Sequence, residues 1–126
     1  MKKLLFLIVL FISVGNGIWA QFPKAIFPGD YPDPSILRDG KDYYMTHSPF
    51  CYAPGFLIWH STDLMHWEPV CRALSGYEAS IWAPDLLKYQ GRYYIYYPTS
   101  MGENYVIYAD NIRGPWSKPV KLDVKH

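Results

Sequence analysis

The sequence predicts an all-β chain built from two copies of one four-stranded unit, and three observations support this. No stretch shows a helical period of apolar residues, whereas short runs rich in tyrosine, isoleucine and valine recur along the chain. Eleven prolines and nine glycines separate these runs at short intervals, as turns do. A Tyr-Tyr pair at positions 43–44 returns at 93–94 in a similar local setting. The chain therefore reads as a repeated β unit.

The first twenty residues have the pattern of a secretory signal peptide. Lys2 and Lys3 precede a continuous apolar run at 4–12, and the small residue Ala20 stands at a plausible cleavage point. The apolar run is too short to span a bilayer, which needs about 20 residues. We therefore expect residues 1–20 to be removed. The mature part, 21–126, is expected to be secreted or periplasmic and to have no membrane attachment.

The mature part is nearly neutral and unusually aromatic. Loss of Lys2 and Lys3 leaves ten basic against eleven acidic residues, and no basic patch predicts a nucleic-acid partner. The whole chain has twelve tyrosines and five tryptophans, which serve either β-sheet packing or the stacking faces of a binding cleft. The two cysteines, Cys51 and Cys71, form either one disulfide or two buried thiols, and their spacing fits no zinc site.

The first unit follows a proline-bounded segment at 22–28. Its first turn is expected at Asp39, Gly40 and Lys41, and Pro/Gly punctuation separates the later runs. The four strands of this unit are predicted at residues 36–38, 42–48, 56–61 and 67–70.

The second unit repeats this order with a period of about 50 residues. Its strands are predicted at 85–89, 92–98, 105–110 and 116–120. Four short strands per repeat are typical of propeller blades, and the paired tyrosines and the terminal tryptophans Trp67 and Trp116 are expected to pack within them. Because such repeats bury their faces only against neighbours, two blades do not close a ring. We expect a truncated part of a longer protein that folds poorly by itself.

One carboxylate, Asp33, stands between two prolines at the entrance to the first strand. Proline fixes its own φ and biases the preceding residue toward extended geometry, so we expect the backbone of Asp33 to be extended and rigid. A carboxylate aimed in advance suits a general base. For this short motif alone, the alternative is an ordinary surface turn.

These motifs, in this order and spacing, resemble the N-terminal part of a family 43 glycoside hydrolase. They are GDYPDPSI at 29–36, DYY at 42–44, PG at 54–55, HSTDL at 60–64 with Trp67, WAPDL at 82–86 and GRYY at 91–94. The resemblance covers most of the chain after the signal peptide. It implies a five-bladed β-propeller, of which this chain holds about the first two blades. It also implies hydrolysis, with inversion, of arabinose- or xylose-containing oligo- or polysaccharides of the β-xylosidase, α-L-arabinofuranosidase or arabinanase type.

The resemblance also implies roles for four residues. Asp33 matches the general base, Phe50 and Trp82 match aromatic positions of the sugar subsite, and Asp85 is expected to support the cleft. In the family, the glutamate acid and a second aspartate come from later blades. We therefore expect the glutamates of this chain to be surface acids and the 126-residue chain to hydrolyse little or nothing. The three glutamates are Glu68, Glu78 and Glu103.

No cofactor is expected in this chain, although a structural ion in the full-length family fold would have its ligands elsewhere. The four histidines are not spaced as a metal site. His47 serves either the packing of the blade or the cleft. Two other functions stay open: a carbohydrate-binding propeller without catalysis, and a structural all-β protein. An acid glutamate in later blades would favour catalysis over binding.

Overall fold

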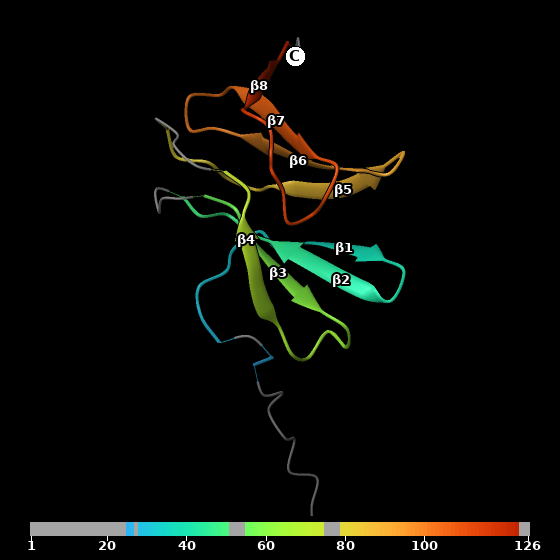
Figure 1. Cartoon of the computed structure of the whole chain (residues 1–126). Helices are drawn as coiled ribbons and strands as arrows, with labels where there is room; N and C mark the ends of the chain where they lie inside the picture. Colours follow the sequence, from blue (N-terminus) through green and yellow to red (C-terminus); the bar gives the residue numbers. More distant parts are fainter. Residues whose placement is uncertain (1–24, 27, 51–54, 75–78, 124–126) are drawn as a thin grey trace, which may run out of the picture.

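The computed structural model describes residues 25, 26, 28–50, 55–74 and 79–123, and the structural account below concerns these residues. They form two four-stranded antiparallel sheets, each a simple meander in chain order (Figure 1). The first sheet contains β1 (Ser35–Asp39), β2 (Asp42–Thr46), β3 (Leu57–Ser61) and β4 (Glu68–Arg72). The second contains β5 (Asp85–Tyr89), β6 (Arg92–Pro98), β7 (Asn104–Ala109) and β8 (Val120–Leu122).

All eight predicted strands have a counterpart, but only those at 85–89 and 92–98 have the predicted bounds, and two of the differences have a clear cause. The strand predicted at 42–48 ends at Thr46, because the backbone N–H of Ser48 donates to Pro32 O at 2.9 Å instead of to a neighbouring strand. The strand predicted at 116–120 is wrong over most of its length, since β8 runs from Val120 to Leu122. Pro119 has no N–H to donate to a neighbouring strand, so the pairing of β8 with β7 begins only after it.

The first hairpin of each sheet turns in two residues, and glycine makes both turns possible. Asp39 pairs with Asp42 in the first hairpin, and Tyr89 pairs with Arg92 in the second. Gly40 has a φ of 65° and Gly91 a φ of 83°, values that favour glycine. The predicted turns are confirmed at both positions.

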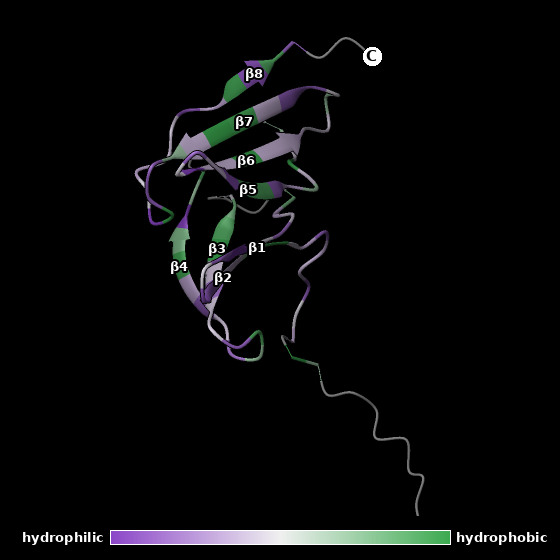
Figure 2. Cartoon of the chain, turned by 90° about the vertical axis from the view of Figure 1, so that its right-hand side faces the viewer, coloured by the Kyte–Doolittle hydropathy of each residue, from purple (hydrophilic) through white to green (hydrophobic). Residues whose placement is uncertain are grey.

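The hydrophobic core lies between the two sheets. Its most deeply buried side chains are Phe56 and isoleucines of three strands, Ile58, Ile95 and Ile107, each 0% exposed. Figure 2 shows the corresponding apolar segments along β3 and in the middle of β7. Tyr44, Tyr93 and Trp116 belong to this cluster or pack against it, so these three predicted packing residues do pack between the blades.

The innermost strands β1 and β5 lie side by side, and polar contacts join them at both ends. At the hairpin end, Asp39 Oδ2 accepts hydrogen bonds from Lys88 Nζ at 2.6 Å and from Tyr93 Oη at 2.5 Å. At the opposite end, Ser35 Oγ accepts a hydrogen bond from Leu86 N at 2.9 Å. We call this second end, where β1 and β5 begin, the site end. Together these contacts fix the relative placement of the two sheets.

Three sequence predictions fall partly or wholly on residues outside the described ranges. The signal peptide at 1–20 and Glu78 lie outside them, as does Cys51. Cys71 is a half-buried free thiol whose Sγ donates to Ile112 O at 3.3 Å, and burial raises the pKa of this thiol. Within the described ranges, no helix is long and apolar enough to cross a membrane.

Candidate functional site

The site end brings together residues that are far apart in the sequence. Asp33 lies two residues before β1, Phe50 follows β2, and Trp82 precedes β5. Two isolated bridges join these segments, Phe50 with Ile81 and Ile81 with Thr99, and Ile81 N donates to Phe50 O at 3.2 Å. The first and second sheets therefore contribute to one surface around Asp33.

The backbone of Asp33 is not extended, which corrects the prediction from its flanking prolines. Its φ is 51°, in the left-handed region. Aspartate tolerates this region better than most residues, and neighbouring contacts can offset the strain of such a conformation. Here the contacts come from Ser48, whose N–H donates to Pro32 O and whose side chain reaches the Asp33 carboxylate. Asp33 is therefore held in one conformation, as expected, but this conformation is left-handed and not extended.

Ser48 is the centre of the hydrogen bonding at the site end. Its Oγ donates to Asp33 Oδ2 at 2.6 Å and accepts from Ala83 N, also at 2.6 Å. The residue is only 2% exposed, whereas Asp33 is exposed at the surface. A buried hydroxyl thus holds a solvent-accessible carboxylate and the backbone of the next blade at the same time.

Phe50 and Trp82 both present aromatic rings to solvent at the site end. Phe50 is 37% exposed and Trp82 40% exposed, high values for such large apolar side chains. Trp82 N donates to Pro98 O at 3.2 Å, which fixes its backbone to the end of β6. Exposed flat rings of this kind suit the apolar C–H faces of a sugar ring.

Asp85, the first residue of β5, lies at the boundary between the two sheets. Its Oδ1 accepts a long hydrogen bond from Ser35 Oγ at 3.4 Å. Ser35 lies two residues after Asp33, so Asp85 occupies the same end of the molecule as the candidate base. The carboxylate remains exposed, and its contact with Ser35 is one of the links between β1 and β5.

Backbone strain concentrates around these residues. Six non-glycine residues in the described ranges have positive φ, and four of them lie at the site end: Asp33, Phe50, Phe56 and Ala83. Such conformations cost about 1–3 kcal/mol each and tend to cluster at functional sites. This clustering of positive φ values is independent of side-chain chemistry, and it occurs at the same site end as Asp33.

His47 is a buried packing residue, the first of the two roles considered for it. Its ring is 9% exposed, stands edge-on to Tyr31 with centroids 4.9 Å apart, and donates from Nδ1 to Ser48 O at 3.2 Å. Burial lowers the pKa of His47, so the imidazole is neutral near pH 7. The ring therefore supports the backbone of Ser48, and it also lines the pocket described next.

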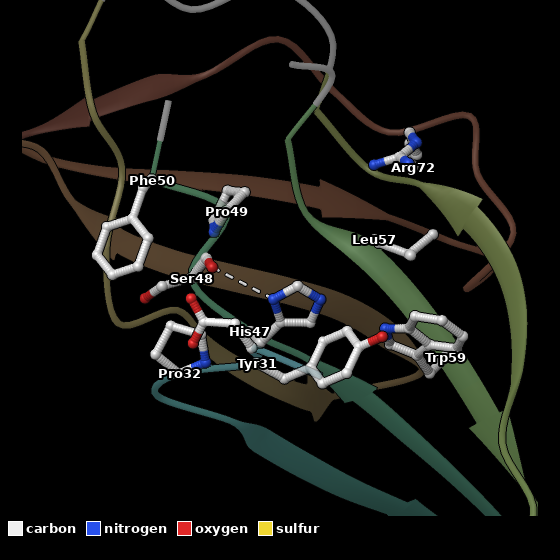
Figure 3. A pocket seen from close by; sticks show the side chains of 10 residues that line it. Tyr31, Pro32, His47, Ser48, Pro49, Phe50, Leu57, Trp59 and Arg72 are labelled. Carbon is white, nitrogen blue, oxygen red and sulfur yellow. Dashed lines mark hydrogen bonds between the residues drawn. The ribbon is translucent and has the colours of Figure 1, made fainter. Parts of the chain in front are cut away.

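A pocket of about 290 Å³ lies next to these residues, on the side of the first sheet turned away from the second sheet (Figure 3). Phe50 lies at one margin of it and Arg72 at another, while His47 and Tyr31 stand between them. Neither Asp33 nor Trp82 lines this pocket.

The two glutamates that the structure describes interact with residues other than those of the candidate site. Glu68 begins β4 at the hairpin end, and its Oε1 lies 3.4 Å from His60 Nδ1. Glu103 accepts hydrogen bonds from Lys121 Nζ at 2.5 Å and from Tyr105 Oη at 2.8 Å. Both are surface acids, as predicted. Among the described residues, no group of three or more histidine, cysteine or acidic side chains is arranged to hold a metal ion.

Sequence reasoning missed the two serines that build this site, Ser35 and Ser48. A serine just beyond a strand commonly bonds nearby backbone, which is the only local signal that either residue carries. Their actual partners lie 15 to 51 residues away. Because these contacts depend on the docking of one sheet against the other, no spacing rule along the chain could have found them.

The fold and the site together define a β-propeller protein whose exposed aspartate and aromatic rings suit carbohydrate. A sequence model of glycosyl hydrolases family 43 matches residues 22–126, and the chain belongs to this family. The predicted fold is thereby confirmed: this all-β chain holds about two blades of a five-bladed propeller.

Individual relatives agree with this assignment. Xylosidase/arabinosidase 43B of Humicola insolens is 37% identical over 121 residues, covering 82% of this chain and 22% of that protein. Non-reducing end α-L-arabinofuranosidase BoGH43B of Bacteroides ovatus is 38% identical over 138 residues, covering 92% of this chain and 25% of that protein. The crystal structure of BlXynB from Bacillus licheniformis aligns with a TM-score of 0.72 at 33% identity, covering 80% of this chain and 24% of that one. The chain thus spans about a quarter of the length of the relatives it matches.

Proposed function

We propose that this chain supplies the general base of an inverting glycosidase that acts on polysaccharides containing xylose or arabinose. The observation that carries the proposal is the exposed carboxylate of Asp33, which accepts a hydrogen bond from Ser48 Oγ at 2.6 Å at the same end of the sheets as the exposed residues Phe50 and Trp82. The relatives support the kind of substrate, since their names describe xylosidases and arabinofuranosidases.

In the proposed mechanism, Asp33 takes a proton from a water molecule as that water attacks the anomeric carbon. Phe50 and Trp82 bind the apolar faces of the sugar and keep the anomeric carbon in front of the water. An acid on the other face of the sugar donates a proton to the leaving oxygen. Inversion requires about 6.5–9.5 Å between the two carboxyl groups, so that a water fits between base and sugar.

We further propose that the acid comes from blades other than these two. Glu68 lies at the opposite end of its sheet from Asp33, and Glu103 is paired with Lys121. The complete site would therefore form only when the remaining blades of the propeller close around the site end. Any structural ion near the propeller axis would also depend on those blades.

The alternative is a carbohydrate-binding propeller that does not catalyse. It is supported by the exposure of Phe50 and Trp82, which would bind a sugar whether or not an acid is present. The two functions differ in one outcome: binding survives the loss of the Asp33 carboxylate, whereas hydrolysis does not.

A graft tests the proposal. Residues 22–126 replace the aligned segment of the Bacteroides ovatus arabinofuranosidase, and release of nitrophenol from 4-nitrophenyl α-L-arabinofuranoside is measured. We expect turnover by the graft, and a loss of kcat of about 10²- to 10⁴-fold in Asp33→Asn. Asparagine tolerates the left-handed backbone as aspartate does, so this variant removes the charge and the base without straining the backbone.

The matched control is Asp63→Asn. Asp63 also accepts a serine hydroxyl, Ser61 Oγ at 3.1 Å, but it lies in the loop between β3 and β4 at the hairpin end. Turnover should be unchanged in this variant. A folded graft that binds arabinose without hydrolysis would favour the binding function instead.

We also propose that the protein is exported, on the basis of its N-terminal sequence. Expression of the full chain in a bacterium followed by mass spectrometry of the periplasmic fraction tests this. The expected product begins at Gln21, and a cytoplasmic product that retains Met1–Ala20 would refute the proposal.

A further inference from the structure

One hydroxyl at the site end connects the candidate base to the second blade. Ser48 Oγ lies 2.6 Å from Asp33 Oδ2 and 2.6 Å from Ala83 N. Asp33 precedes the first strand of the first blade, and Ala83 directly follows Trp82 at the entrance to the second. The serine that bridges them is 2% exposed, so its hydroxyl is shielded from bulk water.

The donor and the acceptor of each of these two hydrogen bonds follow from the protons available. A serine hydroxyl has one proton to donate and lone pairs to accept with. The N–H of Ala83 can only donate, so Ser48 Oγ must accept from it. The single hydroxyl proton is then directed at Asp33, whose carboxylate must be the acceptor.

This arrangement makes the two oxygens of Asp33 different. Oδ2 receives the proton of Ser48, whereas Oδ1 makes no hydrogen bond to any of the described residues. Since Asp33 is exposed, Oδ1 is the oxygen available to a water at the surface. The hydrogen bond from the buried Ser48 hydroxyl also restricts rotation of the charged Asp33 carboxylate.

We propose that Ser48 is a positioning residue that orients Asp33 so that Oδ1 takes the proton of the attacking water. Through Ala83, the same hydroxyl sets the position of Trp82 relative to the base, so docking of the second blade and alignment of the base depend on one side chain. This inference rests on the proposed function of Asp33, and it assigns Ser48 a role that acts through Asp33 and not on the substrate.

The buried serine Ser61 provides a matched control. It is also 2% exposed, donates to an aspartate at 3.1 Å and accepts from two backbone N–H groups, those of Leu64 at 2.9 Å and Asp63 at 3.2 Å. It lies at the hairpin end, away from Asp33. Replacing either serine by alanine thus removes a hydrogen bond to an aspartate together with hydrogen bonds from the backbone, and only Ser48 contacts the candidate base.

The test uses the graft with Ser48→Ala, Ser48→Thr and Ser61→Ala. We expect kcat to fall about 10- to 100-fold in Ser48→Ala, the size of effect of losing a hydrogen bond to a charged group, while KM changes much less. Threonine keeps the hydroxyl and should restore most of kcat. Ser61→Ala should lower the melting temperature and leave kcat unchanged. An unchanged kcat in Ser48→Ala would overturn the inference.

A double variant separates positioning from a general loss of structure. If Ser48 acts only through the Asp33 carboxylate, then Ser48→Ala causes little further loss of kcat in an Asp33→Asn background. A full further loss would show that Ser48 acts by another route and would contradict the inference. Retained activity in Asp33→Asn alone would instead contradict the proposed function, so the two failures are distinguishable.

Amide exchange gives a readout that needs no catalysis. In the graft, exchange at the N–H of Ala83 should become faster in Ser48→Ala and remain slow in Ser48→Thr. Exchange that is equally fast in the parent graft would show that the bond between the blades is absent, and the inference would be wrong.

Discussion

At the scale of single residues, the site depends on backbone conformations that side chains seldom adopt. Asp33, Phe50 and Ala83 all have positive φ, and each touches Ser48 or the bridge between the blades. The cost of these conformations is offset by the docking of one sheet against the other. The aromatic and acidic groups are therefore aimed before any ligand binds.

Removal of the exposed rings should weaken substrate binding more than it slows chemistry. In the graft, we expect Phe50→Ala and Trp82→Ala each to raise KM severalfold, because aromatic contact area with the sugar is lost in both ground and transition states. Steady-state kinetics with the aryl arabinofuranoside measure this. A large fall in kcat at constant KM would show instead that these rings act on the transition state alone.

The residue types of the site could be predicted from the sequence, but their geometry could not. Asp33, Phe50, Trp82 and Asp85 stand in recognisable motifs, and the structure places all four at the site end. The extended backbone expected for Asp33 was wrong because Ser48, fifteen residues away, supplies contacts that a local rule for X-Pro does not include.

At the scale of elements, the two sheets are joined at both ends of β1 and β5. The ammonium of Lys88, and then the hydroxyl of Tyr93, hold the pKa of Asp39 below its usual range. A carboxyl whose folded-state pKa is lowered stabilises the fold above its unfolded pKa of about 3.9. This stabilisation is lost as the pH falls from that value through the folded pKa.

We therefore expect acid to destabilise the parent graft more than an Asp39→Asn variant. The comparison is between melting temperatures at pH 5 and pH 3. The variant should be less stable at pH 5, and the difference between the two proteins should shrink at pH 3. A gap that is the same at both pH values would show that the ion pair contributes nothing to the docking of the sheets.

The bounds of a strand could be predicted where the sequence repeat is regular. The predictions failed where side chains replace the backbone hydrogen bonds of the sheet. β5 and β6 have the predicted bounds, because each shows a clear β pattern ended by a turn or a proline. β8 begins later than predicted because Ser117 makes its own bonds to Tyr108, donating from N at 2.8 Å and accepting at Oγ from Tyr108 N at 3.0 Å. The serine side chain takes over what would have been a ladder bond.

At the scale of the whole molecule, the face of the second sheet turned away from the first remains aromatic and exposed. Tyr94 stacks on Tyr96 with centroids 6.2 Å apart and contacts Tyr108 at 6.3 Å. Tyr96 and Tyr108 are 36% and 37% exposed, and Val120 is 47% exposed. An apolar face of this kind suits packing against another blade.

Tyr96→Lys should therefore have opposite effects in two contexts. In the 21–126 chain by itself, we expect the substitution to reduce self-association, measured by light scattering after size exclusion. In the graft, where another blade covers this face, the same substitution should lower the melting temperature. Tyr89→Lys is the control, since Tyr89 is 62% exposed near the hairpin turn. Equal effects of the two substitutions would contradict a role of this face in blade packing.

The central claim is that Asp33 acts as a base on water, and rescue by azide tests it most directly. Azide needs no deprotonation, so it can replace activated water in an Asp33→Gly graft, where glycine also accepts the left-handed backbone. We predict that this variant is nearly inactive in buffer. With sodium azide, it should regain turnover and yield the glycosyl azide of inverted anomeric configuration, identified by NMR. Unimpaired hydrolysis without azide, or a rescued product of retained configuration, would contradict the account.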